Sequence, residues 1–114
     1  MPCIHARLRI NAAEQPKNDL QKKLSDLVST AFSKPQAYIM SEIVSGCSLY
    51  MNGKSLEKGA YISISLLGNA SKPACSELTK SICDVLSHDF NIDGASVYVT
   101  YNPTNLWGWN GMMF

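Results

Sequence analysis

The sequence is poor in charge, since only 17% of its 114 residues are Asp, Glu, Lys or Arg, against about 25% in typical domains. Ten basic and nine acidic residues leave a net charge of +1 and form no basic block, which argues against nucleic acid or an anionic membrane as a partner. No apolar run approaches the roughly 18 residues that a membrane span needs. The shortage of charge suggests that part of the surface is buried against partner subunits.

Cysteine pairs and histidine clusters are also missing. The four cysteines are scattered and none has CxxC spacing to another: Cys3, Cys47, Cys75 and Cys83. The two histidines lie far apart in the sequence, and both are interpreted as ordinary surface or strand residues. We therefore expect neither a metal site nor, in a chain made in the cytosol, a disulfide framework.

The N-terminal residues do not resemble a signal peptide, because His5, Arg7 and Arg9 interrupt the apolar residues. We expect a cytoplasmic protein, and secretion would need a route that uses no signal peptide. The length fits one domain, residues 1–114. A domain of this size buries only a modest fraction of its surface, which favours oligomers.

The first half of the chain has the pattern strand, helix, strand. Residues 3–10 alternate between apolar and polar side chains, which predicts a strand with one wet face. Apolar residues then recur at helical spacing from Pro16 to about Phe32, and Pro35 forbids continuation of this helix. The apolar residues 38–44 predict a second strand.

The second half repeats this pattern. Residues 61–67 alternate cleanly and predict a strand. Ser71 can cap a helix that ends near Asp89. Residues 96–101 predict a last strand, which Pro103 closes.

Two β-α-β units predict an α+β domain, with a four-stranded mixed sheet and two helices on one face. The other face of the sheet would be bare in a monomer, and further subunits are the simplest cover. Between the two units, Asn52-Gly53 is a turn signal, because glycine readily adopts a positive φ.

A proline follows the initiator methionine, and a residue this small normally allows the methionine to be removed. The mature chain would then begin with the secondary amine of Pro2. Burial and a nearby cation lower the pKa of an amine, so this group could act as a general acid–base catalyst. Taken alone, Met1-Pro2 is a weak signal, and a proline that merely starts a strand is the more common case.

Five short motifs occur in order along the whole chain: Met1-Pro2, residues 33–39, Leu67-Gly68, residues 97–99 and residues 108–111. Together they resemble the macrophage migration inhibitory factor family of the tautomerase superfamily. The resemblance implies a homotrimer in which three sheets line a central barrel and the helices face outward. It also implies three active sites, each at a subunit interface.

The resemblance further implies roles for individual residues. Pro2 matches the acid–base residue, and Lys34 matches the lysine near the amine and the acid group of the substrate. The backbone N–H of Leu67 matches a group that helps to hold the substrate, and a neighbouring subunit supplies Tyr98 and Thr100. Four aromatic residues match positions around the pocket rim or the subunit boundary: Tyr38, Trp107, Trp109 and Phe114.

The implied reaction is keto–enol tautomerisation of phenylpyruvate-like α-keto acids and dopachrome-type substrates, with no metal or organic cofactor. Without the family, Lys34 is simply a solvated lysine at a helix end. Tyr98 and the two tryptophans are then packing residues. A second hypothesis is a secreted, cytokine-like ligand of a cell-surface receptor in which tautomerase activity is incidental. A third is a structural trimer with a degenerate pocket.

The sequence departs from the family at three places. Thr100 stands where vertebrate members often have asparagine, which is expected to alter binding rather than abolish it. Residues 59–62 replace the CxxC of some members, so their oxidoreductase activity is expected to be absent. Residues 51–55 differ from the usual Phe-Gly-Gly-Ser loop, which leaves the shape of this loop and any receptor contact open.

Overall fold

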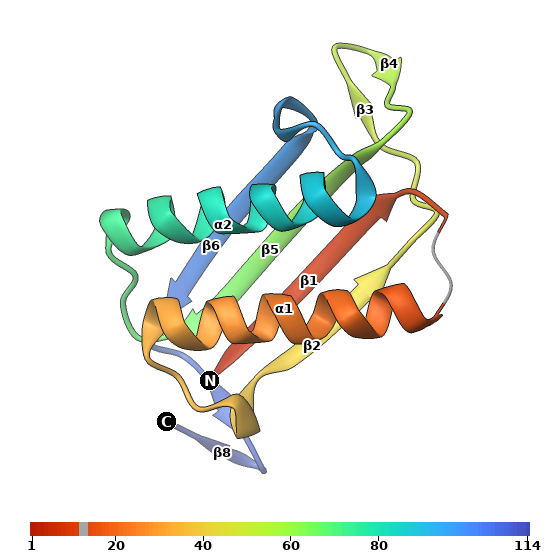
Figure 1. The fold of residues 1–114 in the computed structure, drawn as a ribbon. Coiled ribbons are helices and arrows are strands. Elements are labelled where there is room, and N and C mark those ends of the chain that lie inside the picture. Colours follow the sequence, from red (N-terminus) through yellow and green to blue (C-terminus); the bar gives the residue numbers. More distant parts are fainter. Residues whose placement is uncertain (12–13) are drawn as a thin grey trace.

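In the computed structural model, which describes residues 1–11 and 14–114, two long helices lie on one face of a four-stranded sheet (Figure 1). The sheet contains β1 (Pro2–Arg9), β2 (Met40–Val44), β5 (Gly59–Leu67) and β6 (Val97–Thr104), and the helices are α1 (Glu14–Phe32) and α2 (Lys72–Phe90). The smaller elements are η1 (Gln36–Tyr38), β3 (Tyr50–Met51), β4 (Lys54–Ser55), η2 (Gly94–Ser96), β7 (Gly108–Trp109) and β8 (Met112–Met113). The predicted α+β fold is confirmed.

The strand order is β2-β1-β5-β6. β1 is parallel to β2, β5 is parallel to β6, and the two β-α-β units meet where β1 runs antiparallel to β5. In this register Pro2 pairs with Leu66. The beginning of the chain therefore lies beside the end of β5, although about 60 residues separate them in sequence.

The core lies between the sheet and the helices. The apolar residues of β1 and β5 alternate toward the helices, whose own apolar stripes face the sheet, as the periodicities of strand and helix require. The fully buried side chains include Ile4, Leu8, Leu20, Leu24, Ile62, Ile64, Ile82 and Leu86. Neither helix in the described ranges is long and apolar enough to cross a membrane.

The end of α1 determines where Lys34 lies. Ser33 has φ 52°, in the left-handed region that commonly ends a helix. The N–H of Lys34 still donates to the carbonyl of Ser29, at 3.0 Å, and Pro35 follows with extended backbone. The predicted helix end is confirmed, and it leaves Lys34 at the start of the connection to β2.

Three details differ from the sequence predictions. Tyr38 belongs to a 3₁₀ turn rather than a strand, because its N–H donates to the carbonyl of Pro35, at 3.2 Å. β6 continues through Pro103 to Thr104, which an edge strand tolerates because only one of its sides is paired. The C-terminal segment folds into the β7–β8 hairpin, which the sequence analysis did not predict.

Both hairpins turn on an Asn-Gly pair. Asn52 and Gly53 have φ 54° and 71°, and Asn110 and Gly111 have φ 52° and 79°. Two consecutive positive φ values match the tight turn whose twist suits a β-hairpin. The predicted turn at Asn52-Gly53 is confirmed, and the β3–β4 hairpin that it forms projects beyond the sheet (Figure 1).

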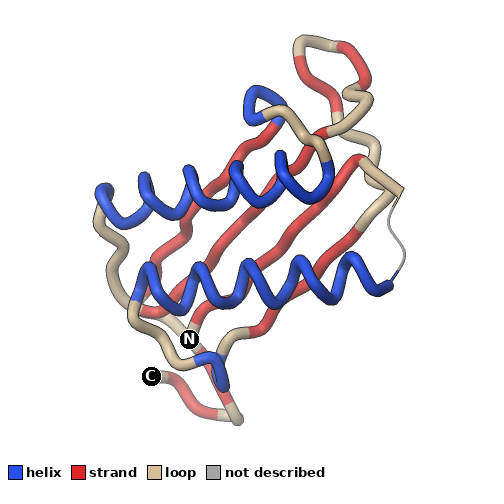
Figure 2. The backbone as a smooth tube through the Cα atoms, viewed as in Figure 1, coloured by secondary structure: helices blue, strands red, loops and turns tan. Residues whose placement is uncertain are grey.

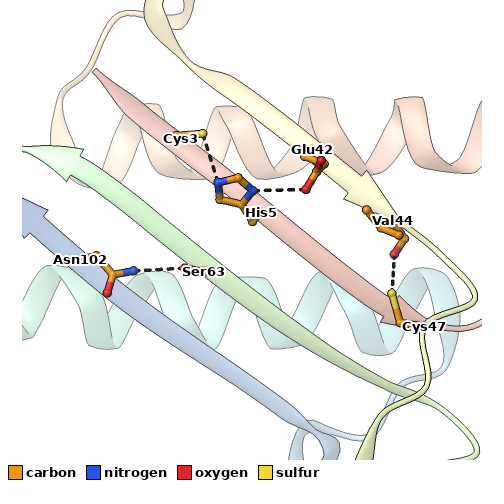
Figure 3. A network of polar contacts seen from close by, with 7 residues as sticks. All are labelled: Cys3, His5, Glu42, Val44, Cys47, Ser63 and Asn102. Atoms are coloured by element: carbon orange, nitrogen blue, oxygen red, sulfur yellow. Dashed lines mark hydrogen bonds and ion pairs between the residues drawn. The ribbon is translucent and has the colours of Figure 1, made fainter. Parts of the chain in front are cut away.

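The second face of the sheet is bare in the single chain. Figure 2 shows both helices on the same side of the strands, and within the described ranges no helix covers the other side. This open face is largely polar: the side-chain amide of Asn102 donates to the hydroxyl of Ser63, at 3.1 Å (Figure 3). A polar face does not require a dry cover and is compatible with a wet space between subunits.

Candidate active site

A cavity of about 570 Å³ opens where β1 begins. Its walls come from the N-terminus, from the turn and strand that follow α1, and from the C-terminal segment, and they are lined by Met1, Pro2, Cys3, Ala37, Tyr38, Ile39, Met40, Trp107, Gly108 and Trp109. A cavity of about 540 Å³ between α1 and β2 contains none of the predicted site residues. The first cavity is therefore the candidate site.

The N-terminal amine lies at this cavity, in surroundings that disfavour its charged form. Burial, and then the positive charge of Lys34, lower the pKa of the Met1 amine from its ordinary value. The next residue, Pro2, is fully buried. Removal of Met1 would transfer the amine to Pro2, beside the same cation.

Lys34 and Leu67 meet beside the N-terminus. The Nζ of Lys34 donates to the carbonyl oxygen of Leu67, at 3.2 Å. The backbone N–H of Leu67 donates to the carbonyl oxygen of Met1, at 3.3 Å. That carbonyl is bonded to the nitrogen of Pro2, so the Leu67 N–H points to the space directly beside this nitrogen.

This hydrogen bond has a consequence for the processed chain. When Met1 is removed, the N–H of Leu67 loses its partner, and an acceptor in the same place would lie next to the Pro2 amine. One small space would then have a base, a cation and a free N–H donor around it. Such a set can bind a carboxylate or an enolate oxygen while a proton is transferred.

Aromatic side chains form one wall of the cavity. Tyr38 contacts Trp109 edge-on, with ring centroids 5.8 Å apart, and Phe114 stacks on the same indole at 6.0 Å. The N–H of Phe114 donates to the carbonyl of Trp107, at 2.9 Å. Three of the four predicted rim residues therefore line the cavity, and Phe114 reaches it through Trp109.

Tyr98 and Thr100 do not reach the cavity of their own chain. Tyr98 pairs with Tyr61, which in turn pairs with Arg7. Five residues of strand, or about 16 Å, separate Arg7 from Pro2. Tyr98 lies 66% exposed on the open face, and the Thr100 hydroxyl is 3.1 Å from that of Tyr61. A second subunit would have to bring these groups to the site.

The sequence analysis missed several residues of the lining, among them Cys3 and Met40. These two pair in the parallel register of β1 and β2. The adjacency of Cys3 to Pro2 was a signal that could have been used. The sequence held no comparable signal for Met40, because the register of two parallel strands is set by the intervening helix and not by a local motif. Within the described residues no group of three potential ligands could hold a metal ion.

All of residues 1–114 match the family model described as macrophage migration inhibitory factor (MIF). The chain belongs to the MIF family. The chain is 31% identical to macrophage migration inhibitory factor of Xenopus laevis over 117 aligned residues, covering 100% of this chain and 99% of the relative. For the Xenopus tropicalis protein the identity is 33% over 98 residues, with 83% and 84% covered.

The fold is similar to that of solved MIF structures. The crystal structure of Leishmania major MIF2 superposes with a TM-score of 0.90 at 20% identity, covering 100% of this chain and 97% of the other. The resemblance drawn from the five motifs is thus confirmed.

Proposed function

We propose that the protein is a MIF-type tautomerase, an isomerase that interconverts the keto and enol forms of small aromatic α-keto acids. Phenylpyruvate-like and dopachrome-type compounds are its proposed test substrates. The observation that carries this proposal is the meeting of three groups at the N-terminus: the N-terminal amine, whose residue lines the apolar cavity, and the Nζ of Lys34 and the N–H of Leu67, which lie beside Met1 without belonging to the lining.

In the proposed reaction, the neutral amine of Pro2 takes a proton from the carbon next to the carbonyl of the keto acid. The electrons of that C–H bond form the enolate, and the protonated amine then gives the proton to the enolate oxygen. A lowered pKa allows the amine to accept and to return the proton near neutral pH. No atom is gained or lost, and no cofactor enters the step.

Lys34 and Leu67 are proposed to hold the substrate while this proton moves. The ammonium group of Lys34 would bind the carboxylate as a compact positive charge. The Leu67 N–H, released by the removal of Met1, would donate to an oxygen beside the amine. The rings of Trp107 and Trp109 offer an apolar surface for the aryl group and exclude water from it.

Tautomerisation of phenylpyruvate by the purified protein tests this proposal, together with the intact mass of the same sample. The expected result is a mass that lacks one methionine and a steady turnover well above the buffer rate. If the chain is trimmed and still shows no turnover, the tautomerase proposal is wrong. A sample that retains Met1 is first treated with a methionine aminopeptidase and then assayed.

We also propose that the active form is a homotrimer. The bare polar face of the sheet and the distance of Tyr98 and Thr100 from the cavity of their own chain support it. In a closed ring each subunit presents the same surfaces to its neighbours. One neighbour's Tyr98 hydroxyl could then donate to the substrate at the Pro2 of the next chain.

Mixing two inactive variants should restore activity if each site combines two chains. Pro2→Gly replaces the secondary amine of the proposed base by a primary amine without the ring, and Tyr98→Ala removes the group from the neighbour. When equal amounts are unfolded and refolded together, about one quarter of the sites should combine an intact Pro2 with an intact neighbouring Tyr98. The measurement is turnover of the mixture against each variant refolded alone. If the mixture shows only the sum of the activities of the two variants refolded alone, the site does not include Tyr98 of another subunit.

A second candidate function is that of a receptor ligand. The Xenopus relatives carry the name of a migration inhibitory factor, and the β3–β4 hairpin offers a projecting surface outside the cavity (Figure 1). Binding of the Pro2→Gly protein to cell-surface receptors separates the two functions. Binding that persists without turnover would show that they are independent, whereas the absence of any binding by the wild-type protein would exclude this second function.

A further inference from the structure

Three side chains form a line across the open face of the sheet, beside the cavity. The Sγ of Cys3 is 3.5 Å from Nε2 of His5, and Nδ1 of the same ring is 3.3 Å from Oε1 of Glu42 (Figure 3). Cys3 and His5 lie two residues apart on β1 and so share one face of the strand. The parallel register places Glu42 of β2 opposite His5.

Cys3 differs from the other cysteines in having an imidazole partner. The Sγ of Cys47 donates to the carbonyl of Val44, at 3.8 Å (Figure 3), and burial raises the pKa of the Cys75 and Cys83 thiols. Throughout the described ranges no other cysteine contacts a histidine side chain. Cys3 also lines the candidate cavity, which the other three do not.

The order of the three groups indicates which nitrogen of His5 carries its proton. When Nδ1–H of His5 donates to the carboxylate of Glu42, Nε2 is left as an acceptor that faces the thiol. Burial, and then the negative charge of Glu42, raise the pKa of the Cys3 thiol. The thiol is therefore protonated at rest, and it becomes a good nucleophile only when a base takes its proton during the attack.

We propose that Cys3 is a second reactive centre at the cavity, with His5 as its base and Glu42 as a positioning residue, and that it captures α,β-unsaturated carbonyl compounds. An aromatic enone fits the surroundings, since its ring can pack on the Trp107 and Trp109 side of the cavity while its soft β-carbon meets the sulfur. This proposal goes beyond the tautomerase function and does not require it.

The capture step is an addition and has no leaving group. The S–H bond breaks and its proton moves to Nε2 of His5, while the sulfur forms a bond to the β-carbon of the enone. The π electrons of the C=C bond form an enolate, and the protonated imidazole returns the proton to the α-carbon. The product is a thioether that carries every atom of both reactants.

The side chains of this line can be reached in the single chain. Those of His5 and Glu42 are 45% and 58% exposed in the single chain, so both residues can be replaced without opening the core of the subunit. His88, whose side chain is 89% exposed and hydrogen-bonded to Asp89, provides a matched histidine that lies outside this line.

The test uses 4-phenylbut-3-en-2-one as the probe and follows the adduct by intact mass and peptide fragmentation, so the readout does not depend on turnover. The expected result is one rapid adduct on Cys3 in the wild-type protein. His5→Gln should slow it by about 10²-fold or more, as the loss of a positioned base does. Glu42→Gln should slow it by about 10-fold or more, and Glu42→Asp should recover part of the rate.

His88→Gln and Cys47→Ser are the matched controls, and neither should change the rate at Cys3. Slow labelling of Cys47, compared in every variant, reports whether the fold is intact. An adduct on the N-terminal amine in place of Cys3 would overturn the proposal. So would faster labelling of another cysteine, or a rate at Cys3 that both His5→Gln and Glu42→Gln leave unchanged.

Discussion

Replacement of Pro2 by glycine should lower kcat/KM for phenylpyruvate by about 10²- to 10⁴-fold, the range expected for loss of a positioned general base. Glycine still allows Met1 to be removed, so the variant keeps an amine at the same end of the chain. That amine is primary and lacks the ring that is fully buried in the wild-type strand. The measurement is steady-state tautomerisation by wild type and variant with matched intact masses.

A protein that retains Met1 is the matched control for this variant. It keeps the Pro2 ring, but the Pro2 nitrogen is then part of an amide and cannot accept a proton. Its Leu67 N–H is also occupied by the carbonyl of Met1. It should therefore be as inactive as the glycine variant. If kcat/KM changes by less than about 10-fold in either protein, the loss is smaller than the usual contribution of a general base. That result would show that the amine is not the base.

Replacement of Lys34 by alanine should raise KM for phenylpyruvate by about 10- to 100-fold, the loss expected for one hydrogen bond to a charged group. It should also change the pH dependence. The charge of Lys34 lowers the pKa of the N-terminal amine, so its removal lets that pKa rise. Because the proposed base is the neutral amine, the acid limb of kcat/KM should move to higher pH.

Lys58 supplies the control for this variant. Its Nζ donates to the carbonyl of Phe90, at 3.4 Å, and it lies before the beginning of β5, whereas Lys34 meets the end of that strand. Lys58→Ala should leave both KM and the pH profile unchanged. Equal effects of the two replacements would mean that Lys34 acts only through the overall charge of the protein.

Much of the fold could be predicted from local pattern. The alternation in residues 61–67 and the helical spacing before Phe32 identify their elements without further information, because burial of one face imposes the period. Ser71 was predicted as a cap, and its hydroxyl accepts from the N–H of Ala74, at 3.2 Å. The β7–β8 hairpin escaped prediction because strands of two residues carry no periodicity.

The site was predictable only through the family resemblance. Pro2, Lys34 and Leu67 are separated by more than thirty residues at each step, and no local pattern links them. Their meeting depends on the antiparallel register of β1 with β5 and on the residue at which α1 ends. The family resemblance indicated that these residues meet because it covers the whole chain and not one local segment.

Neither the local sequence pattern nor the family resemblance predicted the contact that His5 makes with Glu42. His5 was interpreted as an ordinary strand residue, and the sequence places no acidic residue near it. Its contact with Glu42 arises from the parallel pairing of β1 and β2, across 37 residues of sequence. Pairing of this kind is set by the crossover through α1, so the line of side chains beside the cavity appears only in three dimensions.

Titration of the Pro2 amine by ¹⁵N NMR in the trimmed protein, set against the pH profile of kcat/KM, tests the central claim most directly. The account predicts a single pKa, seen by both methods, that lies below the range of about 7.7 to 8.0 for an ordinary α-amino group. It also predicts that this pKa rises in Lys34→Ala. An amine that titrates at or above the ordinary range, or a rate profile that does not follow its titration, would contradict the assignment of Pro2 as the acid–base catalyst.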